Sequence, residues 1–193
     1  MEEKVTRQKR KKNKTHKSIM HAAKYLFDQK GINNVTVDEI SELADISRST
    51  FFTHFNSIDD LLIEIANQEI EDLIEVVSKE QKTGLDNIQL LLITLIEDIY
   101  KYPSLSMFLL TNCILNKKNE SSKLIVEIIK HELIEDNLDK FKGFDLDELT
   151  GLLLGSVFGL LYQKFIEGTP FNDIEQQKLT ICKILNVFNL EEK

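Results

Sequence analysis

Apolar residues recur every three or four positions along most of the chain, and no segment sustains an alternation of apolar and polar residues. The first spacing gathers apolar side chains on one face of an α-helix, whereas the second is typical of a β-strand. The pattern therefore predicts an all-α protein with eight or nine helices. The amphipathic segments are residues 19–27, 37–43, 61–77, 88–99, 124–133, 149–165 and 179–188, and a further apolar segment, 105–115, follows Pro103.

Residues 36–54 have the pattern of two short helices joined by a tight turn. Thr36 and Glu39 fit a capping box, in which each side chain binds a free backbone amide at the start of a helix. After a break at Asp45, Ser47 is a suitable N-cap for a second helix that runs to about His54. Such a pair is either a helix-turn-helix or a hairpin that only packs within a helical core, and the spacing leaves both interpretations open.

The second short helix would present polar side chains on one face and turn Phe51 and Phe55 inward. Arginine can pair with a guanine edge or a phosphate, and hydroxyl and imidazole groups can donate to phosphate oxygens. The polar face therefore predicts DNA contacts. The candidate contacts in and before this helix are Thr36, Val37, Ser47, Arg48, Ser49, Thr50, Phe52, Thr53 and His54.

Charge is distributed unevenly along the chain, whose formal net charge is −8. Residues 1–57 hold 11 Lys and Arg against 7 Asp and Glu, whereas residues 58–193 hold 13 against 25. This asymmetry suggests that a basic N-terminal part meets a polyanion while an acidic body stays away from it.

The basic residues are concentrated at the start of the chain, where the first 17 residues carry eight of them. Residues 1–14 have almost no apolar content and are expected to form a disordered arm. Such an arm can enter a minor groove or follow phosphates, with Lys11, Lys12 and Lys14 as candidate contacts. A solvated tail that only aids solubility is the alternative.

A set of residues at fixed spacing extends the helix-turn-helix pattern on both sides. The set consists of His21-Ala-Ala-Lys-Tyr-Leu-Phe27, Gly31, Thr36-Val37, Ile40, Ala44, Ile46-Ser47, Thr50-Phe-Phe-Thr-His-Phe55 and Asp60-Leu-Leu62. Over about residues 15–65, the chain thereby resembles the N-terminal domain of TetR-type (TetR/AcrR) transcriptional regulators. The resemblance implies a homodimer whose recognition helices enter successive major grooves of a palindromic operator. It also implies a C-terminal body that dimerises and usually binds a small inducer.

With this resemblance, the chain divides into a basic arm (1–14), a three-helix DNA-binding head (15–60) and a helical ligand-binding and dimerisation body (61–193). Three positions depart from the family's usual residues. Asp45 replaces the turn glycine, and aspartate tolerates the left-handed conformation better than most residues do. Phe52 replaces a tyrosine and Ile58 replaces a lysine, so two partners for phosphate are lost.

Three glycines, Gly151, Gly155 and Gly159, recur every four residues on one face of the segment 149–165. Each costs a helix roughly 1 kcal/mol relative to alanine, so the repetition suggests close approach of another backbone. The same helix of a second subunit is the candidate, and Cys182 and Leu185 on one seam of the last helix would complete this dimer interface. A ligand resting on the glycines is the alternative.

Other candidate sites are less specific. Tyr100, Met107, Phe108, Phe158 and Tyr162 could line an apolar ligand pocket, although ordinary core packing explains each of them. The segment from His131 to Glu135 lacks the second histidine of a zinc helix and fits a surface pair. The sequence contains no recognisable catalytic set of nucleophilic or acid–base residues and no phosphate-binding glycine loop. We therefore expect neither a metal nor a cofactor, and no enzymatic activity.

We therefore expect a cytoplasmic, homodimeric repressor that a small apolar or amphipathic ligand releases from double-stranded DNA. A membrane-spanning segment is not expected, because the longest uncharged stretches have 15 residues and a spanning helix needs roughly 20. Two alternatives stay open. The body could bind a protein partner instead of a small molecule, or the head could be the vestige of a DNA-binding domain on a ligand-binding protein.

Overall fold

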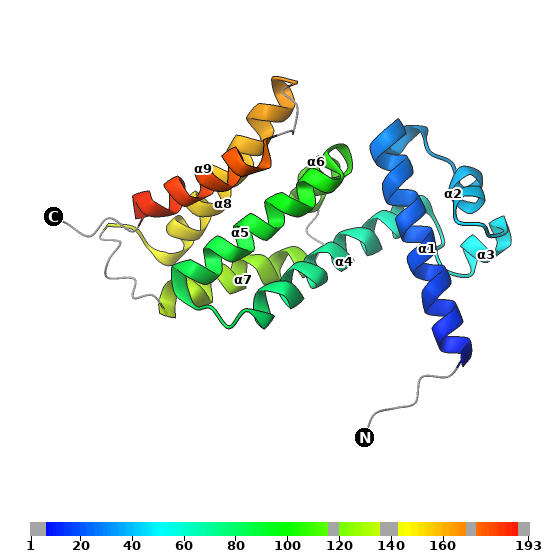
Figure 1. Cartoon of the computed structure of the whole chain (residues 1–193), viewed down its shortest axis with the longest axis horizontal. Coiled ribbons are helices and arrows are strands. Elements are labelled where there is room, and N and C mark those ends of the chain that lie inside the picture. Colours follow the sequence, from blue (N-terminus) through cyan, green and yellow to red (C-terminus); the bar gives the residue numbers. More distant parts are fainter. Residues whose placement is uncertain (1–6, 116–119, 136–142, 169–172, 189–193) are drawn as a thin grey trace.

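The computed structural model of the chain describes residues 7–115, 120–135, 143–168 and 173–188, and its regular elements are all helical. Figure 1 shows a small head, which contains α1 to α3, joined by α4 to a larger body. The elements are α1 (Arg7–Lys30), the 3₁₀ turn η1 (Ile32–Asn34), α2 (Val37–Leu43), α3 (Arg48–Phe52), α4 (Ile58–Lys79), α5 (Gly84–Lys101), α6 (Pro103–Leu115), α7 (Glu120–Glu135), α8 (Leu146–Ile166) and α9 (Ile174–Phe188). The prediction of an all-α fold is confirmed.

The core of the head is formed by apolar side chains from α1, α2, α3 and the start of α4. Phe27 of α1, Ile40 of α2, Phe51 of α3 and Leu61 of α4 are all fully buried in it. Leu105 of α6 belongs to the same cluster, so the body contributes one helix end to the head. The predicted boundary at residue 60 falls inside α4, which runs without interruption from head to body.

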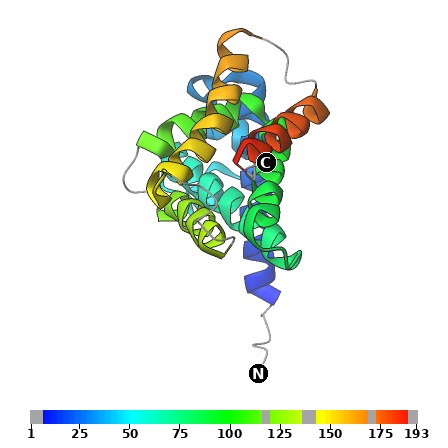
Figure 2. The ribbon, with the colours of Figure 1, turned by 90° about the vertical axis from the view of Figure 1, so that its left-hand side faces the viewer.

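The core of the body lies around α5, which packs against α4, α6, α7 and α9. Figure 2 shows the helices of the body gathered into a bundle, with the N-terminal end of α1 projecting away from it. Leu91, Ile129, Leu153 and Ile181 are fully buried contributions from four of these helices. Pro103 begins α6 directly after α5 ends, as the sequence predicts, because proline lacks the amide that would continue a helix.

The prediction that residues 1–14 are disordered is wrong for residues 7–14. These residues form the first two turns of α1, with every side chain exposed, and residues 1–6 lie outside the described residues. Lysine, arginine and glutamine are good helix formers, and neither glycine nor proline interrupts the run between Arg7 and Lys30. The helix nucleated by the buried face from Ile19 onward therefore extends outward through the basic residues.

Candidate DNA interface and ligand cavity

The helix-turn-helix is held in shape by local hydrogen bonds at each of its corners. The capping box predicted at Thr36 and Glu39 is present: the Thr36 amide donates to Glu39 Oε2 at 2.8 Å and the Glu39 amide donates to Thr36 Oγ1 at 3.3 Å. Lys30 Nζ donates to Glu39 at 2.7 Å, and its hydrogen bond, with those of Thr36, lowers the pKa of Glu39 to about 2. Because this carboxyl group stays ionised far below its usual range, the cap persists across ordinary pH.

The turn between α2 and α3 uses Asp45 in the left-handed conformation, with a φ of 54°. The prediction that aspartate can replace the turn glycine is therefore confirmed. Ser47 then caps α3 by accepting from the Thr50 amide at 3.1 Å, and its hydroxyl also bonds to those of Ser49 and Thr50 at 2.8 Å. These contacts fix where the exposed face of α3 points.

Arg48 is the basic residue on the exposed face of α3, and it is oriented by its neighbours. Its Nη1 donates to both carboxylate oxygens of Asp38 on α2, at 2.6 and 2.7 Å. The guanidinium also lies 5.5 Å from the centre of the exposed Phe52 ring. A guanidinium held between a carboxylate and an aromatic face loses less side-chain freedom when it meets a base or a phosphate.

We expect Arg48→Ala to weaken operator binding by about 1–3 kcal/mol and to relax the preference at one base of each half-site. The physical reason is loss of a guanidinium fork that can bind two acceptors of guanine. Binding titrations on single-base operator variants would measure it. Arg48→Lys is the control, because it keeps the charge without the fork. An equal loss on all sequences, restored by lysine, would make Arg48 a phosphate contact.

His54 lies where α3 meets α1. Its ring centre is 5.5 Å from that of His16, and His16 stacks on Phe55 at 4.6 Å. Burial, followed by the charges of His16 and Lys12, lowers the pKa of His54 below its usual value. Burial thus favours the neutral imidazole of His54, which packs against α1, and whether His54 also touches DNA stays a prediction.

The other predicted DNA contacts lie on three elements of the head. Val37 is half-buried against the head core, and Thr53 donates its hydroxyl to the Thr50 carbonyl at 2.6 Å. Lys11, Lys12 and Lys14 lie on the exposed first turns of α1. Whether these residues touch DNA stays a prediction.

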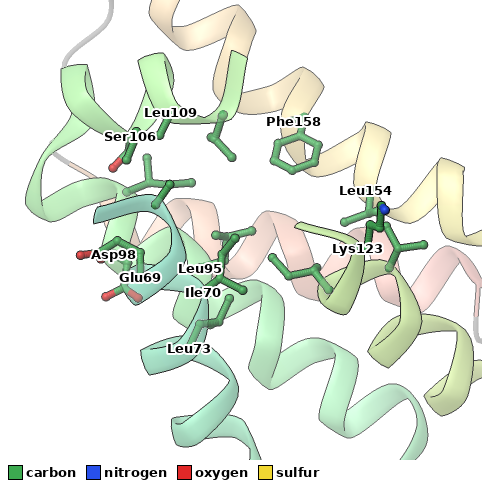
Figure 3. A pocket seen from close by; sticks show the side chains of 15 residues that line it. Glu69, Ile70, Leu73, Leu95, Asp98, Ser106, Leu109, Lys123, Leu154 and Phe158 are labelled. Atoms are coloured by element: carbon green, nitrogen blue, oxygen red, sulfur yellow. The ribbon is translucent and has the colours of Figure 1, made fainter. Parts of the chain in front are cut away.

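A cavity of about 450 Å³ lies inside the body, between α4, α5, α6, α7 and α8. Most of its walls are apolar, which is typical of small-molecule sites of this size. Figure 3 shows Glu69, Asp98 and Ser106 grouped at one end, and Lys123 lies near Leu154 and Phe158 at the other. Glu69 and Ser106 come from the two helices of the body that also pack against α1.

The predicted pocket residues do not gather around this cavity, and Phe158 alone of the five lines it. Met107, Phe108 and Tyr162 line a separate hollow of about 280 Å³ beside Phe27 of the head. Tyr100 packs against the body core and donates its hydroxyl to the Asp173 carbonyl at 3.4 Å. The five side chains are thus divided between the cavity, the smaller hollow and the body core, and whether any of them contacts a ligand stays a prediction.

The acidic residues of the cavity were missed by sequence reasoning, although the sequence holds a signal for one of them. Glu69 lies four residues after the buried Ile65 and four before the buried Leu73, so it occupies a position on the apolar face of α4. A carboxylate at such a position requires a partner or a solvated hollow.

The three glycines of α8 lie on an exposed face. A Cβ atom added to Gly151, Gly155 or Gly159 would meet nothing within 4 Å, so no other part of the described chain covers them. On α9, Leu185 is buried in the body core and Cys182 is half-buried. Leu185 was predicted in the dimer interface, but it packs within its own subunit because α9 lies against α5 and α8.

Among the described helices, α8 is the one whose length and composition would allow it to cross a membrane, with a mean hydropathy of 1.4 over its most apolar window. Only 28% of that window is buried. A core helix of a soluble protein passes the same test, so the result is weak evidence for a membrane segment.

Residues 19–65 match the family described as bacterial regulatory proteins, tetR family. A sequence comparison with curated proteins gives no match.

Solved structures with the same fold span nearly the whole chain. The fatty acid degradation regulator FadR from Bacillus halodurans has a TM-score of 0.74 at 15% identity, covering 90% of this chain and 93% of that chain. A transcriptional regulator from Aquifex aeolicus has a TM-score of 0.70 at 20% identity, covering 90% and 98%. FadR from Bacillus subtilis, solved with stearoyl-CoA, has a TM-score of 0.65 at 16% identity, covering 89% and 96%. Residues 19–65 therefore form an N-terminal domain of the tetR family with its helix-turn-helix in the expected place, and the chain as a whole has the fold of these solved regulators.

Proposed function

We propose that the protein is a homodimeric, cytoplasmic repressor that binds a palindromic operator and is released from it by a small apolar or amphipathic ligand. The observation that carries this proposal is the course of α4. The helix begins at the Ser57 cap, directly after the helix-turn-helix, and its side chains Glu69, Ile70 and Leu73 form one wall of the cavity. A ligand that shifts this part of α4 also shifts the start of the same helix, against which α3 packs in the head core.

The arrangement of the head supports DNA binding by two elements. The exposed face of α3 carries Arg48 between Asp38 and Phe52, and the start of α1 carries a run of basic side chains that projects from the molecule. A short helix in the major groove with basic side chains along the flanking backbone gives both sequence readout and salt-dependent affinity. The proposed contacts are those named from the sequence, with the basic residues now on a helix.

The exposed face of α8 supports the proposed dimer. Leu152, Tyr162 and Phe165 are exposed on the same helix as the three uncovered glycines. Several exposed apolar side chains on one helix are typical of a contact with another molecule, and small residues allow two helices to approach closely. We therefore assign this face to the second subunit.

We expect Gly155→Leu to shift the protein from dimer to monomer. In the single chain a leucine meets no neighbour at this position and improves helix propensity, so the subunit should stay folded. In the dimer the added side chain would overpack the seam at a cost of about 1–3 kcal/mol. Sedimentation velocity over a concentration series would measure the shift, and Gly155→Ala should give a smaller one. A leucine variant that remains dimeric but loses its response to ligand would move the ligand to this face.

The whole proposal can be tested by selecting genomic DNA fragments with the purified protein and then titrating the selected site. We expect an inverted repeat whose half-site centres lie about one helical turn, or a multiple of it, apart. Because the B. subtilis FadR structure contains stearoyl-CoA, long-chain acyl-CoA thioesters belong in the first ligand panel. A true ligand raises the melting temperature and lowers operator affinity. Absence of any selected site would favour a vestigial head, and operator binding that no small molecule alters would favour a protein partner.

A further inference from the structure

The end of the cavity nearest the head is acidic and shares one of its carboxylates with the head. We propose that the cavity takes an apolar ligand with a cationic end, and that this cation binds Glu69 and Asp98 in place of Lys24. This inference rests on the proposed release by a ligand and names the chemical class of that ligand. Its structural basis is the side-chain group of Glu69, Asp98 and Ser106 at one end of an otherwise apolar cavity.

Glu69 connects the cavity with α1. Its carboxylate forms an ion pair with Lys24 Nζ, and the side chains of Lys24 and Glu69 are only 18% and 32% exposed. An ion pair in a partly buried position is screened less than one at the surface, so whichever cation occupies it has a large effect. Lys24 belongs to α1, whose next turn packs in the head core through Phe27. The Glu69 carboxylate therefore lines the cavity and also forms the ion pair with α1 of the head.

Asp98 adds a second carboxylate at the same end of the cavity. It accepts from Lys101 Nζ at 2.6 Å, and the Lys101 side chain is 64% exposed. The hydrogen bond to Asp98, with smaller contributions from Asp98, Glu69 and Glu97 charges, raises the pKa of Lys101. Because Lys101 is solvated, it can swing outward at little cost when a ligand cation arrives.

The polarity of the cavity argues against an anionic group at this end. A carboxylate or phosphate placed beside Glu69 and Asp98 would meet like charges in a partly desolvated space. An ammonium there gains charge-assisted hydrogen bonds to both carboxylates, with the Ser106 hydroxyl at the same end, while its apolar body fills the space toward Phe158. An anionic ligand would have to lie the other way round, with its charge near Lys123 and its tail against the two acids.

Displacement of Lys24 gives a path from ligand to DNA. Besides this ion pair, α1 is joined to the rest of the chain by a hydrogen bond from the Ser104 amide to Asp28 at 3.2 Å, by the packing of α6, by a contact of His16 with Glu64 at 3.7 Å and by the apolar cluster that it shares with the start of α4. Loss of the Lys24–Glu69 pair removes the partly buried ion pair between α1 and the middle of α4, which lowers the cost of changing the angle between them. By linkage, DNA that favours the paired arrangement must weaken cation binding by the same factor.

The test compares three probes with the same apolar tail: decylammonium, decanol and decanoate. Their affinities for the full-length protein are measured by calorimetry, with operator affinity and melting temperature in parallel. We expect decylammonium to bind roughly 10-fold more tightly than decanol, because one charge-assisted pair is worth about that factor, and decanoate to bind most weakly. Glu69→Gln should remove the advantage of the amine without changing decanol affinity. Glu71→Gln, an exposed position on the same helix, is the matched control and should change neither.

Lys24→Met tests the displacement itself. Without the competing lysine, decylammonium should bind several-fold more tightly, yet lower operator affinity less than it does in the wild type. Equal binding of amine and alcohol to the wild type overturns the proposal, as does tighter amine binding that Glu69→Gln leaves intact. Tighter binding of decanoate than of the amine overturns the proposed ligand class. The proposed release from the operator by a ligand would still stand if decanoate lowered operator affinity. If none of the probes binds while an acyl-CoA releases the operator, this inference fails and the proposed function stands.

Discussion

Replacing Phe51 by alanine is expected to abolish operator binding while the body stays folded. Phe51 is fully buried in the head, where its ring centre lies 5.8 Å from that of Phe55. Truncating a buried phenylalanine costs about 3–5 kcal/mol, which is a large share of the stability of a small three-helix unit. The loss should fall on the head, because the core of the body is a separate cluster of side chains around α5.

Phe52→Ala is the matched control for the folding of the head, although not for DNA binding, because Phe52 is itself a proposed DNA contact. Phe52 is the next residue of α3, but its side chain is 44% exposed, so its removal leaves no cavity. Hydrogen exchange would measure the outcome: in Phe51→Ala the amides of α2 and α3 should lose protection, whereas those of α5 and α8 should keep it. Loss of protection through the whole chain would show that head and body unfold together, which would contradict the division into two cores.

The helix-turn-helix could be predicted from the sequence because its determinants are local. Thr36, Glu39 and Ser47 act on amides three residues away, and Asp45 adopts its turn conformation without help from distant residues. The same local reasoning failed at the start of α1. A polar run without apolar residues looks unable to fold by itself, but here it continues a helix already held by the buried Ile19.

The ligand cavity could not be predicted in the same way, because it depends on how five distant helices pack. Aromatic residues such as Tyr100 and Tyr162 are plausible lining residues by type, yet neither lines this cavity. Tyr100 packs against the body core, and Tyr162 lines the smaller hollow beside the head. Glu69 was the informative residue, since a charge on an apolar face indicates a special environment. Likewise, an apolar seam containing Leu185 indicates burial but not whether the partner is the same subunit.

Glu132 carries a buried carboxylate, although its neighbour His131 is exposed. The sequence gives no reason to single it out, because the segment from His131 to Glu135 fits a surface pair. In the structure, its two oxygens accept from the Gly84 amide at 2.7 Å and from Asn87 Nδ2 at 2.8 Å. Gly84 begins α5 with a φ of 62°, a backbone conformation that is strained for residues with a Cβ atom and accessible to glycine. Glu132 therefore ties the start of α5 to α7 at a point where the backbone would otherwise have an unpaired amide.

We expect Glu132→Ala to destabilise the body by about 2–6 kcal/mol, because it leaves two buried donors without acceptors and each costs about 1–3 kcal/mol. Glu135→Ala, one turn later on the exposed face of α7, is the control and should stay within about 0.5 kcal/mol of the wild type. Denaturant unfolding followed by circular dichroism would give both values. Glu132→Gln should fall between them, since an amide can accept from one donor but turns its own donors toward the other. If Glu132→Ala unfolds at the same denaturant concentration as Glu135→Ala, water has replaced the carboxylate and the tie between α5 and α7 contributes no stability.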